Sequence, residues 1–472
     1  MRMRLIMMAT PQRVALTTIA CLALAVPPSM ADDTALRPNI VFILADDLGY
    51  GDLSCFGQRN FSTPHLDRLA AEGLKLTNHY AGSTVCAPSR ACLLTGMHTG
   101  HVYQRLNGTI QFRDDPLDIT VARHLKQAGY HTALIGKSGL SCNSDDGGLP
   151  NRKGFHYVYG CTSHGAAHRY YPEWLWDNGQ RIELHGNDVF EGEHYSGDLF
   201  LDKALLYLEQ HASKPFFLHL ALQQPHADLN VPTKWREPFV GKFQETPFGG
   251  RWYRPETHPK ATFAGMVTYL DHSVGLVVQK LKELGIAERT LVIFSSDNGA
   301  MSEGGWSRDY FNSSGPLRGG KRDLYEGGIR VPTIAWWPGV VAAGQTSDHV
   351  SAFWDFLPTA CELAGATPPA DIDGISYAPL LLGGKQPQHE FLYWEFYERG
   401  GKQAIRQGQW KGVRLNVSRD RDGPLELYDL HADPGETTDV ASNHPEVVAK
   451  LARLMQSAHT ESEVVSFENV AE

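Results

Sequence analysis

The sequence predicts an α/β protein: a large mixed sheet between helices, followed by a smaller antiparallel sheet with a terminal helix. Short, continuously apolar runs indicate strands that are buried on both faces. Helical segments lie between these runs, which is typical of a sheet covered by helices. Beyond about Tyr377 the pattern changes to short strand-like pieces divided by Gly and Asp turns. A length of 472 residues fits one large domain and a smaller one.

The strands of the large sheet are expected at residues 39–45, 216–222 and 290–295. One helix is expected from Thr63, the N-cap, with Pro64 in its first turn. Two more are expected at residues 120–128 and 264–284, the second closed by Gly285.

In the C-terminal part, four short strands are expected at residues 391–397, 403–406, 410–414 and 425–428. A helix is expected at residues 445–458. We therefore predict an N-terminal domain over residues 32–376 and a C-terminal subdomain over residues 377–472.

Residues 1–31 are predicted to be a secretory signal peptide. A basic start precedes an apolar run at 14–26 and small residues before a cleavage point after Ala31. The alternative is an N-terminal membrane anchor, but the run is shorter than the roughly 20 residues that a spanning helix needs. We therefore expect an exported, periplasmic or extracellular protein without stable membrane insertion. Few cysteines remain after cleavage, and Cys142–Cys161 is one disulfide that the sequence allows.

The charge balance limits the classes of partner. The chain has 43 Lys+Arg against 53 Asp+Glu, a formal net charge of -10, and no basic cluster. We therefore expect no general nucleic-acid binding. A small anionic substrate remains compatible, because it needs only local positive charge.

Acidic and amide side chains follow two of the apolar strands. Asp46 and Asp47 come after the first, and Asp297 and Asn298 after the last. Either pair alone is more typical of a simple turn. Together they predict a site for a hard divalent cation, because such ions prefer oxygen ligands with excess negative charge.

The segment Cys86-Ala-Pro-Ser-Arg90 fits the core C-x-P-S-R of a sulfatase signature. The chain resembles the type I, formylglycine-dependent sulfatases of the alkaline phosphatase superfamily over nearly its whole mature length. The other matching segments are 38–52, Gly136-Lys137, Pro225-His226, 297–299 and 317–332. The resemblance implies an alkaline phosphatase-like fold, with residues 32–376 as the catalytic domain.

The resemblance implies that a maturation enzyme oxidises Cys86 to formylglycine, whose hydrate is the nucleophile. Asp46, Asp47, Asp297 and Asn298 would hold Ca²⁺, or Mg²⁺, which also touches residue 86. Further roles follow by similarity: Arg90 orients the diol, Lys137 and Lys321 bind sulfate oxygens, and His226 protonates the leaving oxygen. Outside the motifs, a lone Lys is usually a solvated surface residue and a lone His a satisfied core residue.

One position departs from the family. Many members have a histidine where this chain has Gly139, and that histidine is placed to take a proton from the diol as sulfate leaves. His168, His164 or a water would have to serve instead.

Aromatic side chains and polar neighbours suggest a sulfated carbohydrate as substrate, with ordinary core packing as the equally weighted alternative. The aromatic set is Tyr170, Tyr171, Trp174, Trp176, Trp394 and Tyr397, and the polar set includes His168, Arg169, Gln403 and Arg406. His168 and Arg406 are the predicted substrate contacts. Two other functions compete: hydrolysis of a phosphate or phosphonate ester, and sulfoglycan binding without catalysis.

Overall fold

The computed structural model describes residues 37–140, 150–161 and 163–469. The predicted signal peptide, residues 1–31, and Cys142 of the allowed disulfide lie outside the described residues.

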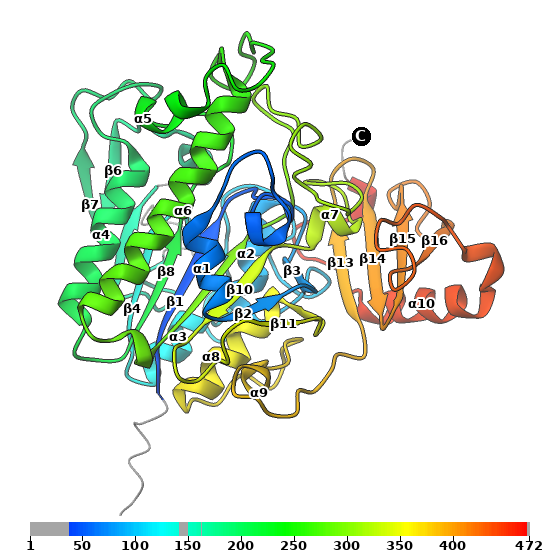
Figure 1. The fold of residues 1–472 in the computed structure, drawn as a ribbon. Coiled ribbons are helices and arrows are strands. Elements are labelled where there is room, and N and C mark those ends of the chain that lie inside the picture. Colours follow the sequence, from blue (N-terminus) through cyan, green and yellow to red (C-terminus); the bar gives the residue numbers. More distant parts are fainter. Residues whose placement is uncertain (1–36, 141–149, 162, 470–472) are drawn as a thin grey trace, which may run out of the picture. The chain divides into compact units, whose positions relative to one another are not determined.

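The described residues form a ten-stranded mixed sheet (Figure 1). Its order is β11 (Gln345–Ser347), β2 (Leu74–Leu76), β10 (Thr333–Trp336), β9 (Thr290–Ser296), β1 (Asn39–Ala45), β8 (Phe216–Ala221), β4 (His131–Gly136), β5 (Tyr157–Gly160), β6 (Trp174–Asp177) and β7 (Gln180–Glu183). Strands β9, β1, β8, β4 and β5 run parallel, so their carboxyl ends meet at one edge. A separate two-stranded sheet pairs β3 (His79–Tyr80) with β12 (Ser351–Ala352).

Alternate residues of β1 point into two different cores, as the two-residue period of a strand requires. Ile40, Phe42 and Leu44 pack with α2 (Cys86–Thr95), α3 (Val121–Gln127) and α8 (Phe356–Ala364). Val41, Ile43 and Ala45 pack with α1 (Pro64–Ala71), α4 (Ser196–His211) and α6 (Pro259–Glu283). The sheet therefore lies between two helical layers, which confirms the predicted fold class.

The C-terminal residues form a four-stranded antiparallel sheet, β13 (Leu392–Phe396), β14 (Lys402–Gln407), β15 (Trp410–Leu415) and β16 (Leu425–Asp429). Helix α10 (Pro445–Ala458) packs on one face through Leu451 and Met455. The other face joins the larger core, and Trp394 Nε1 donates to Ala81 O at 3.0 Å. Three short α-helices complete the α-helices of the described residues: α5 (Thr233–Arg236), α7 (Glu326–Ile329) and α9 (Ala378–Leu381).

The expected strands and helices are present with small shifts at their ends. The helix expected from 264 begins earlier, at Pro259. Thr120 caps its helix by accepting from Arg123 N, whereas the Thr63 side chain makes no cap bond and instead accepts from Ser54 N. Helix α6 is long and apolar enough to cross a membrane, but 72% of its apolar window is buried inside the protein, as in a core helix. The domain boundary at 376/377 stays a prediction.

Candidate active site

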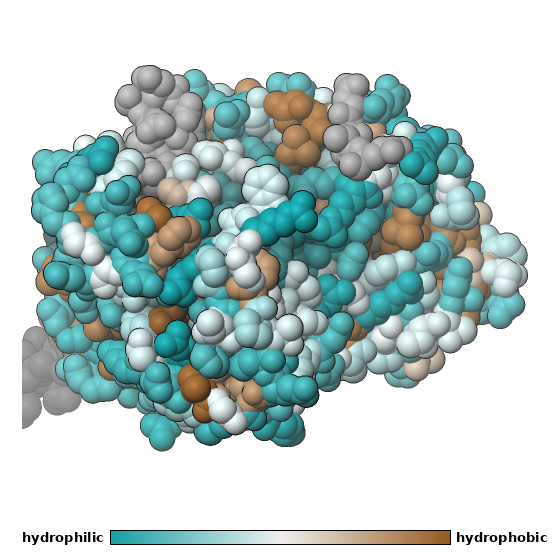
Figure 2. Space-filling model, turned by 90° about the horizontal axis from the view of Figure 1, so that it is seen from above, coloured by the Kyte–Doolittle hydropathy of each residue, from teal (hydrophilic) through white to brown (hydrophobic). Residues whose placement is uncertain are grey.

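The site begins where β1 and β9 end side by side. The two strands are parallel with Ala45 opposite Ser296, so the residues that follow them are neighbours. Asp47 N donates to Asp297 Oδ1 at 3.0 Å, and Asn298 Nδ2 donates to Asp47 Oδ1 at 2.7 Å. These side chains are fully buried. Strand β1 runs upward in Figure 1, and Figure 2 looks onto the molecule from that side, where the surface is mainly hydrophilic with small, separate apolar patches.

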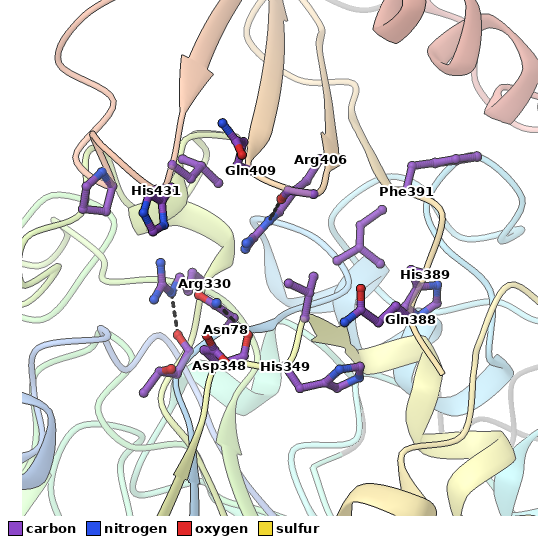
Figure 3. Close-up of a pocket in the computed structure, with 16 residues that line it drawn as sticks. Asn78, Arg330, Asp348, His349, Gln388, His389, Phe391, Arg406, Gln409 and His431 are labelled. Carbon is purple, nitrogen blue, oxygen red and sulfur yellow. Dashed lines mark hydrogen bonds between the residues drawn. The ribbon is translucent and has the colours of Figure 1, made fainter. Parts of the chain in front are cut away.

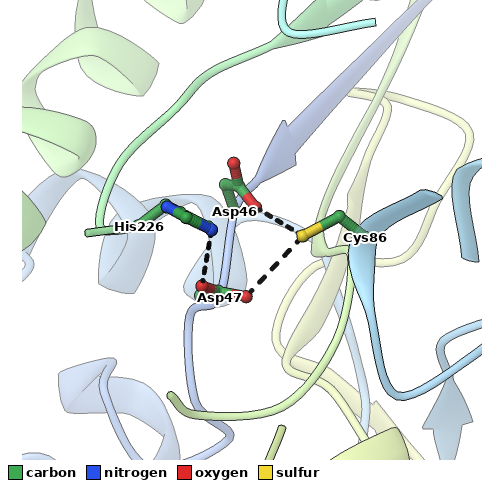
Figure 4. Close-up of side chains that lie close together, drawn as sticks. All are labelled: Asp46, Asp47, Cys86 and His226. Atoms are coloured by element: carbon green, nitrogen blue, oxygen red, sulfur yellow. Dashed lines mark hydrogen bonds and ion pairs between the residues drawn. The ribbon is translucent and has the colours of Figure 1, made fainter. Parts of the chain in front are cut away.

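Cys86 is the first residue of α2 and faces these carboxylates. Its Sγ lies 3.4 Å from Asp46 Oδ1 and 4.0 Å from Asp47 Oδ1 (Figure 4). Burial raises the pKa of the thiol well above its usual value, and the negative charges of Asp297 and Asp46 raise it further. The sulfur is therefore held as a neutral thiol, which is a poor nucleophile.

Arg90 lies one helical turn after Cys86, on the same side of α2. Its Nε and Nη2 both donate to Asp297 Oδ2, at 2.9 and 2.7 Å. Its Nη1 donates to the carbonyl of Lys137. The helix thus places the Cys86 thiol and the Arg90 guanidinium against one group of buried carboxylates, with Asp46 next to both.

Two lysines end on the acidic residues. Lys137, which follows β4, has its Nζ 2.5 Å from Asp46 Oδ2 and 3.6 Å from Cys86 Sγ. Lys321 Nζ lies 2.7 Å from Asp47 Oδ2. Both side chains are almost completely buried. The surface alternative for a lone lysine therefore does not apply here.

His226 follows β8 and is the last member of the buried cluster, which also contains Asp46, Asp47, Cys86, Arg90, Lys137, Asp297, Asn298 and Lys321. Its Nε2 lies 3.3 Å from Asp47 Oδ2 and 3.2 Å from Lys321 Nζ, and its Nδ1 contacts the carbonyl of Ala227. Burial lowers the pKa of His226 well below its usual value, and Lys321 and Lys137 add to that effect. The ring sits between an anion and a cation, where a proton can be exchanged.

The donor set fits a hard cation. Asn298 Oδ1 is buried and has no hydrogen-bond partner among the described residues. Burial and the nearby Asp297 raise the pKa of Asp46 to about 7, a cost that a bound cation would remove. Ligand atoms of Asp46, Asp47, Cys86 and His226 all lie within 4.8 Å of one another. Carboxylate and amide oxygens are the ligands that Ca²⁺ and Mg²⁺ prefer.

A side chain at the Gly139 position would need a left-handed backbone and a shift of Ile110. The residue has φ +77°, and a Cβ there would lie 2.8 Å from Ile110 Cδ1. Ile110 thus occupies the space into which a side chain at this position would project.

His168 lies close to the cluster, and His164 lies next to it. The His168 ring stacks on His226 with centroids 4.2 Å apart, and the His164 ring is 5.2 Å from that of His168. Tyr170 donates to the carbonyls of Gln223 and His226 at 2.9 and 2.8 Å, so it holds the backbone on which His226 is carried.

Arg406 lies in a different cavity of about 450 Å³ (Figure 3). Residues of the connections that follow β2, α7, β11 and β16 help to line it, among them Asn78, Arg330, His349 and His431. Arg406 donates to Tyr80 OH and to Gly408 O, and no contact joins it to the cluster among the described residues. Of the two predicted substrate contacts, the structure brings only His168 to the site.

The aromatic set divides in two. Tyr170, Trp394 and Tyr397 are buried and pack in the interior, so the core alternative holds for them. Tyr171, Trp174 and Trp176 are partly exposed.

Sequence reasoning missed Glu303. Its Oε2 lies 3.2 Å from Lys321 Nζ and accepts from Tyr253 OH at 2.8 Å, while its Oε1 pairs with Arg322. Burial opposes ionisation, but Lys321 and Arg322 hold the pKa of Glu303 at about 2. Glu303 lies between the matching segments 297–299 and 317–332, so no sequence motif predicts its place beside Lys321.

Comparisons with known proteins agree with this geometry. The sulfatase family model matches residues 38–366, and the model of the N-sulphoglucosamine sulphohydrolase C-terminal region matches residues 319–461. Arylsulfatase A of Homo sapiens is 34% identical, over 95% of this chain and 90% of that protein. N-acetylgalactosamine-6-O-sulfatase of Bacteroides thetaiotaomicron is 30% identical, over 90% and 93%. The solved structure of Ps i-CgsB with k-i-k-neocarrahexaose has a TM-score of 0.76 at 27% identity, over 89% of this chain and 92% of that one.

Proposed function

The chain belongs to the sulfatase family and is a sulfatase, and from this premise we propose that it removes sulfate from a sulfated carbohydrate. The position of Cys86 carries the proposal: its side chain faces Asp46 and Asp47 and is flanked by Lys137 at 3.6 Å. Carboxylates that can bind a metal cation and a lysine that can bind the sulfate anion both lie next to this one side chain.

The nucleophile is residue 86 after oxidation of its thiol to formylglycine by a maturation enzyme. The neutral, buried thiol supports this, because it is poorly suited to attack sulfur itself. The hydrated aldehyde would supply two hydroxyl groups, one to attack sulfur and the other to help release sulfate afterwards.

Asp46, Asp47, Asp297 and Asn298 would hold Ca²⁺ or Mg²⁺, which would polarise a sulfate oxygen and lower the pKa of the hydroxyl at residue 86. A cation on the carboxylates would free Lys137 and Lys321 to bind sulfate oxygens. Arg90 keeps Asp297 in place through its two donors and orients residue 86. His226 donates a proton to the leaving oxygen.

A carbohydrate substrate is supported by the relatives, one of which is named for a sulfated amino sugar while the structural neighbour was solved with a neocarrahexaose. His168 stands beside the site and is a proposed substrate contact. Arg406 is not included, since it lies in the separate cavity. Retention of Cys86, Arg90 and both lysines favours catalysis over mere binding of a sulfoglycan.

Export through the predicted signal peptide is part of the proposal. A sulfated polymer or its fragments would be met outside the cytoplasm, where a formylglycine-bearing hydrolase of this kind would act on them.

The test combines peptide mass with a substrate panel. Protein produced together with a formylglycine-generating enzyme should carry an aldehyde or its hydrate at residue 86, and Cys86→Ala should abolish turnover. Cys92→Ala is the matched control, because Cys92 lies on the same helix but packs in the core with its Sγ on Gly82 O. The panel should contain defined sulfated sugars, nitrophenyl sulfate, and phosphate and phosphonate esters. Full activity from protein that carries only the Cys86 thiol would refute the mechanism. Faster hydrolysis of phosphonate esters than of sulfate esters would contradict the proposed sulfated carbohydrate substrate.

A further inference from the structure

A row of three imidazoles leads away from the cluster. His226 contacts Asp47 and Lys321, His168 stacks on His226 with an interplanar angle of 16°, and His164 meets the edge of His168. His164 and His168 belong to the connection between β5 and β6, beyond the strand ends that carry the site.

The two outer histidines have hydrogen-bonding atoms that nothing uses. Three ring nitrogens have no hydrogen-bond partner within the described part of the chain: Nδ1 and Nε2 of His164, and Nε2 of His168. His164 is only 6% exposed. Since buried polar atoms in native proteins nearly always pair with protein or ordered water, these nitrogens are open to a partner other than the described residues.

The two imidazoles are kept neutral. Burial lowers the pKa of both, and the charge of Lys137 lowers it further, to about 2 for His168. A neutral imidazole has one donor and one acceptor, which suits an uncharged hydroxyl group. Lys137 and Lys321 already supply the cations proposed for sulfate, so the histidines are free for a different part of the substrate.

The position of His168 is fixed relative to His226. Asp228 N donates to the His168 carbonyl at 3.3 Å, and Arg169 Nη1 lies 2.7 Å from Asp228 Oδ2. These bonds tie the segment that carries His168 to the segment that carries His226. A group held beside the His226 ring would therefore lie beside the His168 ring as well.

We propose that His164 and His168 form a subsite that hydrogen-bonds hydroxyl groups of the sugar released by His226. The inference rests on the proposed function and names the residues that recognise the leaving group. His168 contacts the hydroxyl nearest to the ester, and His164 a group farther along the same sugar.

The experiment compares two leaving groups on His168→Ala, His168→Asn and His164→Ala. The substrates are nitrophenyl sulfate and the sulfated sugar that the wild-type protein hydrolyses fastest in the panel. Loss of a hydrogen bond between uncharged groups should lower kcat/KM for the sugar about 10-fold, mainly through KM. The kcat/KM of these variants for nitrophenyl sulfate should stay within about twofold of the wild-type value. His168→Asn should recover part of the loss, and the exposed control His185→Ala should change neither substrate.

A second measurement separates the sugar from the sulfate. Inorganic sulfate should inhibit wild type and His168→Ala with the same inhibition constant, because it does not reach the proposed subsite. Equal losses on both substrates, or weaker inhibition by sulfate, would overturn the proposal and place the histidines at the sulfate. Hydrolysis of nitrophenyl sulfate but of no sugar would overturn it as well. Absence of all sulfatase turnover in wild type, with residue 86 converted, would instead refute the proposed function.

Discussion

His226 is the residue whose role a change of leaving group can isolate. A sugar alkoxide is a far poorer leaving group than nitrophenolate, so it depends much more on a proton donor. General acid catalysis contributes typically about 10²- to 10⁴-fold. His226→Ala should therefore lose most of its kcat on the sugar sulfate and much less on nitrophenyl sulfate, measured as steady-state rates. Bound sulfate would assist by offsetting Lys321 and Lys137, the cations that lower the pKa of His226.

Lys321→Ala is the control for this comparison. Lys321 is proposed to hold the sulfate itself, which both substrates share, so its removal should damage both alike. If His226→Ala also reduced both rates equally, its role would be to bind sulfate or order the site, and the proton donor would be another group.

At the scale of elements, the sequence predicted those strands and helices that a pattern of neighbouring residues marks. Strands 39–45 and 290–295 are continuous apolar runs, and the acidic residues that follow them could be paired because parallel strands end together. Helix α2 was not predicted, since all of its residues are buried and no polar face marks its period. Glu303 and the filled space beside Gly139 depend on contacts between distant segments, which no local pattern encodes.

The C-terminal sheet is joined to the site-bearing domain by a buried ion cluster. Lys411 of β15 has its Nζ 2.9 Å from both Glu326 Oε1 and Glu436 Oε1, all without exposure to solvent. Lys411→Met should lower the free energy of unfolding by about 3–5 kcal/mol, because it leaves the buried Glu436 without a cation and Glu326 with Arg330 alone. Guanidinium unfolding measures this. Lys280→Met is the control: its 2.6 Å pair with Glu209 lies at the surface, where solvent screens the two charges, so its loss should change stability little.

The same cluster has a pH dependence. Burial would raise the pKa of Glu326, but Lys411 and Arg330 hold it at about 2, below the usual 4.5. The contribution of Glu326 is present above pH 4.5 and is lost as the pH falls toward 2. Glu436 acts in the opposite sense: burial raises its pKa to about 7, so its contribution is greatest below pH 4.5 and falls as the pH rises to about 7. Equal stability losses for the Lys411 and Lys280 variants would mean that the buried cluster contributes no more to stability than a surface ion pair.

For the whole molecule, the cation site predicts how stability depends on pH and on calcium. Burial and Asp297 raise the pKa of Asp46 from 3.8 to about 7. Without a cation, folding therefore favours the protonated acid, so stability is greatest below pH 3.8 for this group and falls as the pH rises to about 7. Each unit of raised pKa corresponds to about 1.4 kcal/mol. A divalent cation binds the ionised carboxylates of the folded chain and should restore what is lost.

The expected result is a rise in melting temperature on adding Ca²⁺ that is small at pH 5 and larger at pH 7.5, measured calorimetrically against protein treated with a chelator. Asp297→Ala should remove most of this gain, because it removes a proposed ligand. Asp271→Asn is the matched control: Asp271 is also a buried carboxylate, but it accepts from Leu66 N at 2.8 Å at the start of α1, away from the site. That variant should be less stable yet keep the full calcium gain. A gain that is equal at both pH values, or that survives in Asp297→Ala, would mean that the cation binds elsewhere and that the buried carboxylates are neutralised by Lys137, Lys321 and Arg90 alone.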